Sequence, residues 1–255
     1  LALPGVIAAS GTQINIFVSQ ALASFETGAK SWLFYADRLY QLPLGLVGVA
    51  VGVAILPRLA RAVRRAEINP DEADTSRSTI DDGVGLAMAL TLPAAAALMI
   101  APVFLIEGLY ARGAFLLSDA QMAGMALFHF GWGVPAFVLI KVLTPAYFAR
   151  EDMKTPMRYA LLSVAINTAL GAGLFFGFKH LGLAGFPGLA IATSVAAWVN
   201  VTFLIVTLAK RDWYRPGKIL VQRLVSCLAA SGAMAATLFW PNAKPDWINV
   251  WCNSN

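Results

Sequence analysis

Apolar residues occur along the chain in long runs that short polar segments separate. A membrane-spanning helix needs about 20 predominantly apolar residues, whereas a helix of a soluble bundle carries polar residues along one face. The runs lack such a face, which argues against both soluble helices and strands. Seven runs are long enough to cross a bilayer: about 3–25, 33–57, 82–106, 122–145, 156–178, 183–208 and 219–240. The pattern predicts an all-α fold, a polytopic membrane helix bundle.

The basic residues of the loops support these spans, because most of them lie on one side. If the first span runs outward, the cytoplasmic loops carry thirteen Lys and Arg, the opposite loops carry four, and two lie inside spans. Such an excess marks the cytoplasmic side of a membrane protein. The thirteen belong to segments 58–81, 146–158 and 209–223. We expect these segments at one end of the bundle, the basic end, and residues 241–255 at the other. For 58–81, a short surface helix and a solvated linker both stay open.

Composition agrees with a membrane protein and excludes other classes. Of the 255 residues, 58% are hydrophobic and 13% charged, whereas soluble domains average about 45–50% and about 25%. The net charge of +5 comes largely from loops beside the membrane, so it gives no argument for a nucleic-acid partner. Cys227 and Cys252 show no metal-binding spacing. The chain has no Walker loop, no Gly-x-Ser-x-Gly motif and no paired carboxylates, so it is not expected to be an enzyme.

Two full charges lie near the start of the second span. Residues 35–61, YADRLYQLPLGLVGVAVGVAILPRLAR, contain Asp37 and Arg38 side by side. Charges inside membrane helices are costly and suggest function. Neighbours on a helix do not face each other, so these two do not form an i,i+4 ion pair. Arg38 therefore needs a carboxylate, a phosphate or a wet cavity. A structural pairing with a neighbouring helix is the alternative.

A row of small residues continues from Arg38 along the same span. Steps of three and four place the following residues on one face: Arg38, Gln41, Gly45, Gly48 and Gly52. Small residues allow close helix packing, or they line a space through which a bulky group passes. Pro43 removes the backbone hydrogen bond to the Leu39 carbonyl, which can bend the helix. The arginine is thus expected at the head of a bent, small-residue face.

The other polar residues of the spans fit structural roles better. Lys141 lies near the cytoplasmic end of its span, where its long stem would let the ammonium group reach the headgroups. Neutral residues such as His129, Asn167 and Asn200 commonly form hydrogen bonds between membrane helices. Apart from Asp82, which caps the start of its run, the spans contain no second carboxylate with which to build a proton relay.

Three motifs resemble the MurJ (MviN) family of lipid II flippases. The first is the stretch at 35–61. The second, KVLTPAYFAREDMKTPMR at 141–158, resembles the family's connection between its tenth and eleventh helices. LYARGAF at 109–115 fits the same alignment. The resemblance covers nearly the whole chain and places it in the MATE-like multidrug/oligosaccharidyl-lipid/polysaccharide exporter superfamily.

The resemblance also implies a domain organisation. The seven spans would correspond to helices seven to thirteen of a fourteen-helix protein. Residues 1–208 would form the second six-helix lobe of a MATE-like flippase. Residues 209–255 would add one transmembrane helix, at about 219–240, and an outer tail. Because the sequence starts at Leu1 without a methionine, we expect the first lobe and the last helix to be missing, and that first lobe to be a partner.

The function implied by the resemblance is the movement of lipid II, the undecaprenyl-diphosphate-linked peptidoglycan precursor, from the cytoplasmic to the periplasmic leaflet by alternating access. Arg38 matches the family's cavity arginine, and a guanidinium suits phosphate oxygens. Asp37 matches the acid before it. Gln41 stands where some relatives carry glutamate, which puts a gating ion pair there in doubt. The expected substrate-binding residues are Arg38, Asp37 and Gln41, and the expected hinge or packing residues are Pro43, Gly45, Gly48 and Gly52.

The partners implied are lipid II and the bilayer of the bacterial cytoplasmic (inner) membrane, which the protein would cross several times. No cofactor is implied, and the coupling ion stays unknown. Two alternatives remain: an exporter of another lipid-linked oligosaccharide or of a drug, and a non-transporting membrane scaffold.

Overall fold

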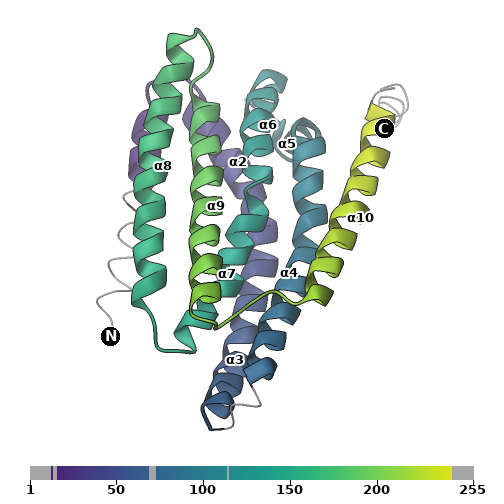
Figure 1. The fold of residues 1–255 in the computed structure, drawn as a ribbon. Helices are drawn as coiled ribbons and strands as arrows, with labels where there is room; N and C mark the ends of the chain where they lie inside the picture. The colour runs from purple at the N-terminus through teal and green to yellow at the C-terminus, as the bar shows by residue number, and fades with distance from the viewer. Residues whose placement is uncertain (1–12, 14–15, 69–72, 114, 243–255) are drawn as a thin grey trace.

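The chain folds into a bundle of long helices, as a computed structural model shows (Figure 1). The structure describes residues 13, 16–68, 73–113 and 115–242. Within these ranges the chain is helical and contains no strand. Residues 16–23 are helical, and the elements that follow are α2 (Ala29–Pro43), the π-helix η1 (Leu44–Val49), α3 (Ala50–Ile68), α4 (Ala73–Ile100), α5 (Pro102–Tyr110), α6 (Leu117–Gly131), α7 (Val134–Phe148), α8 (Lys154–His180), α9 (Phe186–Lys210) and α10 (Lys218–Asn242).

The described helices are long and apolar enough to cross a membrane five times, or six times if one bent pair counts as a single span. The run expected at 33–57 lies in one continuous helix, Ala29–Ala66, made of α2, η1 and α3. The runs expected at 156–178, 183–208 and 219–240 lie in α8, α9 and α10. Most of the run at 3–25, and all but the first two residues of the tail at 241–255, lie outside the described residues.

Two expected spans are interrupted. The run at 122–145 bends by 42° between α6 and α7, where Gly133 lies against Ser194 of α9 with no room for a side chain. The run at 82–106 breaks at Ala101, because Pro102 lacks the N–H that would continue the helix and instead starts α5. Hydropathy does not register either break, since glycine, alanine and proline keep the runs apolar.

The segment at 58–81 is neither a separate surface helix nor a long linker. The helix α3 continues to Ile68 and α4 begins at Ala73, so both spans extend beyond their apolar runs. The ends of α3, α7 and α9 lie together at the lower end in Figure 1, which brings the three basic segments to one end of the bundle.

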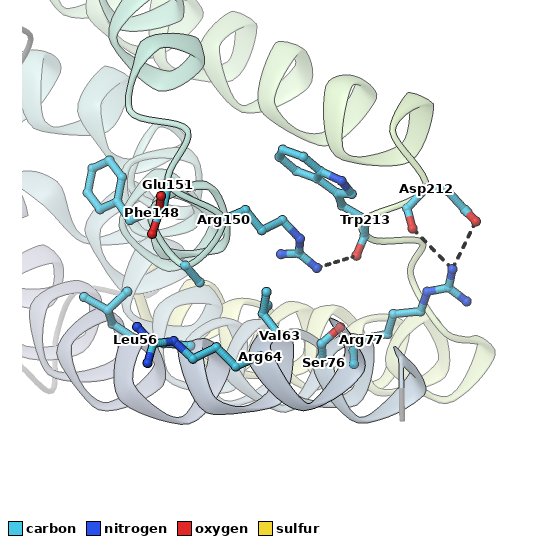
Figure 2. Close-up of a pocket in the computed structure, with 13 residues that line it drawn as sticks. Leu56, Val63, Arg64, Ser76, Arg77, Phe148, Arg150, Glu151, Asp212 and Trp213 are labelled. Atoms are coloured by element: carbon cyan, nitrogen blue, oxygen red, sulfur yellow. Dashed lines mark hydrogen bonds and ion pairs between the residues drawn. The ribbon is translucent and has the colours of Figure 1, made fainter. Parts of the chain in front are cut away.

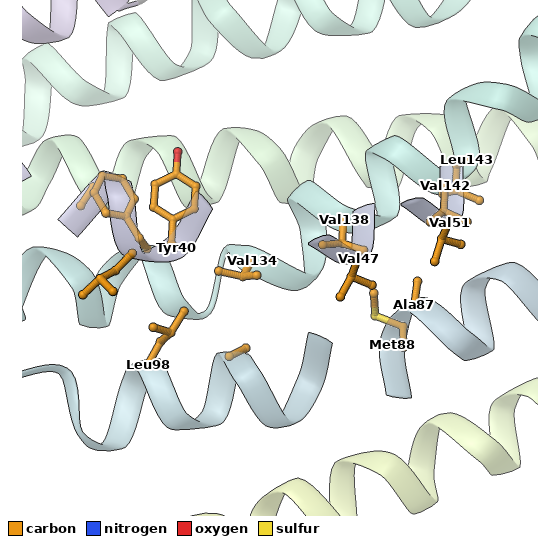
Figure 3. Packing of buried hydrophobic residues seen from close by; sticks show 14 of the residues in the cluster. Tyr40, Val47, Val51, Ala87, Met88, Leu98, Val134, Val138, Val142 and Leu143 are labelled. Atoms are coloured by element: carbon orange, nitrogen blue, oxygen red, sulfur yellow. The ribbon is translucent and has the colours of Figure 1, made fainter. Parts of the chain in front are cut away.

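The core of the bundle is centred on α7. Val134, Val138 and Val142 recur every four residues and are fully buried on one face of this helix. They meet residues of α2, η1, α3 and α4, among them Tyr40, Val47 and Met88, as Figure 3 shows. In contrast, α10 packs against α4 at the edge of the bundle (Figure 1), with 11% of its apolar stretch buried, against 50% for α9. The exposed apolar residues of α10, Ile219, Val221, Val225 and Leu228, fit a surface that faces lipid.

Candidate functional site

A cavity of about 570 Å³ lies beside the continuous helix Ala29–Ala66, around the junction of α2 and η1. The irregular hydrogen bonding at this junction has a local cause. Pro43 has no N–H to donate, the N–H of Leu44 bonds to the carbonyl of Gln41, and the chain continues as the π-helix η1. Residues 16–23, α2, η1, α6, α7 and α9 supply the cavity wall. Its polar lining residues are Ser19, Gln20, Lys30, Asp37, Tyr40, Gln41, Lys141 and Thr193.

An aromatic cluster forms one side of this cavity. The ring of Tyr40 lies 4.8 Å from that of Phe130 at the end of α6 and 5.3 Å from that of Phe137 on α7, measured between centroids. The 42° bend between α6 and α7 places these two phenylalanines on either side of the break. The cavity therefore combines a rigid apolar wall with a few polar groups, as binding cavities commonly do.

Asp37 and Gln41 line the cavity together. The side-chain amide Nε2 of Gln41 donates a hydrogen bond to Oδ2 of Asp37, one turn away on α2. The carboxylate is thus bonded to a neutral neighbour and makes no ion pair among the described residues. Gln41 holds the acid in place without cancelling its charge.

Arg38 makes no ion pair with Asp37 and lies beside Phe34, at the rim of the cavity. Its side chain is exposed, and its guanidinium carbon lies 4.8 Å from the ring centroid of Phe34, which lines the cavity. Within the described ranges it has no carboxylate in ion-pair distance. Among the described residues, Arg38 is therefore paired to no neighbouring helix, and it is not part of this cavity's wall. Its side chain is exposed on the surface that the described residues form.

The glycines of the small-residue face have two different environments, and the change occurs within η1. Gly45 lines the cavity, and a Cβ at this position would meet nothing within 4 Å. Gly48 and Gly52 instead lie against α7: a Cβ on Gly48 would be 3.4 Å from Cγ of Lys141, and one on Gly52 would be 2.9 Å from the Lys141 carbonyl oxygen. Both roles considered for the small residues therefore occur, open space at Gly45 and close helix packing at Gly48 and Gly52.

Lys141 is a cavity residue that the sequence reasoning did not select. Its side chain belongs to the lining together with Asp37 and Gln41. Its place at the start of the motif 141–158 and the two glycines facing it were the available signals. The position of Lys141 near the end of its span, taken alone, favoured a contact of its ammonium group with the lipid headgroups.

The expectation that neutral polar side chains join helices holds for Asn167, whose Oδ1 accepts a hydrogen bond from the hydroxyl of Thr193 at 3.4 Å. At His129 the backbone carbonyl, rather than the side chain, accepts a hydrogen bond from the hydroxyl of Ser194 at 2.7 Å. Within the described residues, Oδ1 of Asn200 is buried without a hydrogen-bond partner. Over the same part of the chain, no three acidic, histidine or cysteine side chains gather as a metal site would require.

A second cavity, of about 790 Å³, lies at the basic end, where Figure 2 shows two of its arginines, Arg77 and Arg150, bonded to neighbouring residues. Arg150 donates to the carbonyl of Trp213 at 3.3 Å and stacks over its ring, and Arg77 forms an ion pair with Asp212 at 3.3 Å. These contacts join the α7–α8 and α9–α10 connections to the start of α4.

Carboxylates of the connections complete this network. Asp152 pairs with Arg211, and Asp81 accepts hydrogen bonds from the Tyr214 hydroxyl at 2.6 Å and the Gly217 N–H at 3.1 Å. Burial raises the pKa of Asp152, but hydrogen bonds from Thr155 and Arg211 outweigh it, so the pKa lies below its usual value. Burial and the bond to Asp81 raise the pKa of the Tyr214 hydroxyl.

Known proteins share both the sequence and the fold of this chain. The family model described as Lipid II flippase MurJ matches residues 1–249. A protein named probable lipid II flippase MurJ, from Rhizobium tropici, is 42% identical over 240 residues, which cover 94% of this chain and 43% of that protein. A protein named lipid II flippase MurJ, from Burkholderia cenocepacia, is 32% identical over 249 residues, covering 97% and 46%.

Solved structures agree on the fold. A lipid II flippase MurJ in an inward closed conformation matches with a TM-score of 0.75 at 22% identity, covering 94% of this chain and 46% of that structure. The chain thus spans somewhat less than half the length of the relatives it matches. The all-α, MATE-like membrane bundle expected from the sequence is confirmed. With the family model matching nearly its whole length, the chain belongs to the lipid II flippase MurJ family.

Proposed function

We propose that this chain forms part of a lipid II flippase, which moves the undecaprenyl-diphosphate-linked precursor of peptidoglycan from the cytoplasmic to the periplasmic leaflet by alternating access. The match of the family model to residues 1–249 carries the proposal. The arrangement of charges supports it: a membrane-length bundle presents Arg38, an unpaired cation, beside a cavity lined by further polar groups.

The chemistry of the substrate explains why such a cation is needed. A diphosphate does not enter hydrocarbon without compensation, because desolvating an isolated charge is very costly. A guanidinium offers several donors in a plane that matches phosphate oxygens and keeps its charge at any physiological pH. Arg38 is exposed, so it is accessible to a ligand or to another part of the complete protein.

We further propose that the lobe consists of residues 1–208, that α10 and the residues after it form an addition to this lobe, and that the missing first lobe supplies the other wall of the transport path. The position of α10 at the bundle edge, packed against α4, supports the division. The basic end would face the cytoplasm of a bacterial cell, with the protein crossing the cytoplasmic membrane several times.

Complementation tests this function. The complete protein that contains residues 1–255 is expressed in cells depleted of their own flippase, as wild type and as Arg38→Ala, Arg38→Lys and Arg65→Ala. We expect loss of rescue for Arg38→Ala and partial rescue for Arg38→Lys. Arg65→Ala, which removes an exposed arginine near the end of α3, is expected to rescue fully. Full rescue by Arg38→Ala would show that Arg38 is not needed to bind the diphosphate.

A binding measurement separates lipid II transport from the alternative substrates. Native mass spectrometry of the complete protein is expected to detect bound lipid II in preference to an unrelated lipid-linked oligosaccharide or a cationic drug. Binding of either of those, with none of lipid II, would instead indicate an exporter of the wider superfamily. Absence of all binding and flipping would favour the scaffold.

A further inference from the structure

We infer that Lys141 supplies a second cationic contact for the diphosphate of the transported lipid, in addition to Arg38. This inference rests on the proposed function and deepens it. Lys141 lies on α7 and lines the cavity, whereas Arg38 lies on α2 at the rim, beside the lining residue Phe34, so the two cations come from different helices.

The stem of Lys141 lies in a slot that two glycines provide. Cβ and Cγ of Lys141 lie 3.5 and 3.4 Å from the position that a Cβ of Gly48 would occupy, and its carbonyl oxygen lies 2.9 Å from that of Gly52. Any larger residue at Gly52 would push α7 away. The glycines thus seat the backbone and the first methylenes of Lys141 directly against η1 and α3.

From this slot the lysine extends into the cavity and away from the basic end. The helix α7 runs toward the basic end, and Cα–Cβ bonds tilt toward the N-terminus of their own helix. The residues of α2 and η1 that share the cavity with Lys141 all precede Gly48, on the side farther from the basic end, and the last three of them are Gln41, Leu44 and Gly45. The headgroup contact expected from the sequence would need the opposite direction.

Charge in the cavity is not balanced by its own wall. The lining carries two ammonium groups, from Lys30 and Lys141, and one carboxylate, that of Asp37. Asp37 is bonded to the amide of Gln41, and Lys141 makes no ion pair among the described residues. A cation at this depth is costly unless an anion approaches it. Phosphate oxygens of a lipid-linked diphosphate offer that anion, and three cations with Arg38 suit a diphosphate better than a monophosphate.

Binding of two lipid probes tests the inference. The Kd values of undecaprenyl diphosphate and undecaprenyl monophosphate are measured by native mass spectrometry on the complete protein, as wild type, Lys141→Met and Lys218→Met. Methionine keeps the length of the stem and removes the charge. Lys218 is exposed at the start of α10, outside the cavity, so Lys218→Met is the matched control for the loss of one charge.

We expect Lys141→Met to weaken diphosphate binding by about tenfold or more, the usual effect of losing a charged hydrogen bond. The preference for diphosphate over monophosphate should fall with it, which a purely structural role would not cause. Lys218→Met should leave both Kd values within about twofold, since exposed charges contribute little. An unchanged diphosphate preference in Lys141→Met, with wild-type binding intact, overturns the role of Lys141 and leaves the proposed function standing. A folded wild type that binds neither lipid overturns both.

Chemical rescue guards against misfolding of the methionine variant. Lys141→Cys is prepared with Cys227 and Cys252 replaced by serine, and its thiol is modified with an aminoethyl or a sulfonatoethyl methanethiosulfonate. The first reagent restores an ammonium group and should restore diphosphate binding. The second adds an anion of similar size and should not. Equal binding after both modifications contradicts a charge contact.

Discussion

The cavity beside Pro43 and the network at the basic end both involve basic residues and carboxylates, but they differ in whether the basic residues are bonded to other parts of the chain. At the basic end, Arg77 and Arg211 bind carboxylates of other segments, and Arg150 binds a backbone carbonyl. Beside Pro43, Arg38 and Lys141 make no ion pair among the described residues. The comparison teaches that Arg77, Arg150 and Arg211 join the connections at the basic end, whereas the described residues do not use Arg38 or Lys141 in this way.

The largest effect is expected from replacing one arginine in each region by alanine and comparing the two variants. Arg38→Ala should abolish rescue of flippase-depleted cells and leave the free energy of unfolding within about 0.5 kcal/mol, as for a surface substitution. Arg211→Ala should lower that free energy by about 1 kcal/mol through the loss of its bond to Asp152, and it should retain rescue. Denaturant titration in detergent supplies the stabilities. If both variants lose stability alike, the division between the two regions is wrong.

The glycine face offers a sharper contrast in stability alone. Gly52→Ala should lower the free energy of unfolding by about 1–2 kcal/mol, because its Cβ would lie 2.9 Å from the Lys141 carbonyl oxygen and force the helices apart. Gly45→Ala should leave it unchanged or raise it by up to about 1 kcal/mol, since its Cβ meets nothing and alanine favours the helix. A tolerated Gly52→Ala would contradict the close packing of α3 on α7.

A smaller effect is expected at the α9–α10 connection. Tyr214→Phe removes the hydroxyl that donates to Asp81 and should cost about 1 kcal/mol, a fall in Tm of about 2–4 °C for a chain of this size. Tyr35→Phe is the matched control. Its ring packs on Tyr110 and Phe115 without a hydroxyl bond among the described contacts. Equal shifts in the two variants would show that the Tyr214 bond contributes nothing.

The smallest effect concerns pH. Because the folded-state pKa of Asp152 lies below that of the unfolded chain, about 3.9, its contribution to stability is present above that value. It is lost as the pH falls through the folded-state pKa. Wild type should therefore lose stability below about pH 4 more steeply than Asp152→Asn, in denaturant titrations at stepped pH. Parallel curves would show that Asp152 has no depressed pKa.

The fold was largely predictable because hydropathy and loop charge both act over whole spans. The apolar runs correspond to long helices wherever the structure describes them, and the three basic segments lie at one end. The breaks at Ala101 and Trp132–Gly133 were missed, since they depend on a single proline and on tertiary packing against Ser194. Such local causes leave the average polarity of a run unchanged.

The candidate site was predictable only in part. Helical spacing correctly separated Asp37 from Arg38, and the structure places Asp37, Gln41 and Gly45 in the cavity wall and Arg38 at its rim. To predict Lys141 as a cavity residue, one would have to know the direction of its side chain between two helices that lie far apart in the sequence. No pattern along a single helix contains that direction. The binding roles of these residues stay predictions until the variants are measured.

The π-helix η1 introduces a phase shift into the longest helix of the chain. A π turn holds more residues than the 3.6 of an α turn, so the two halves of Ala29–Ala66 are not in one continuous register. Before η1, the helix turns Asp37 and Gln41 toward the cavity. Within and after it, Gly48 and Gly52 meet α7. The helix therefore faces the cavity with one set of residues and α7 with another set that points in a different direction. A regular helix would have to use one face for both contacts.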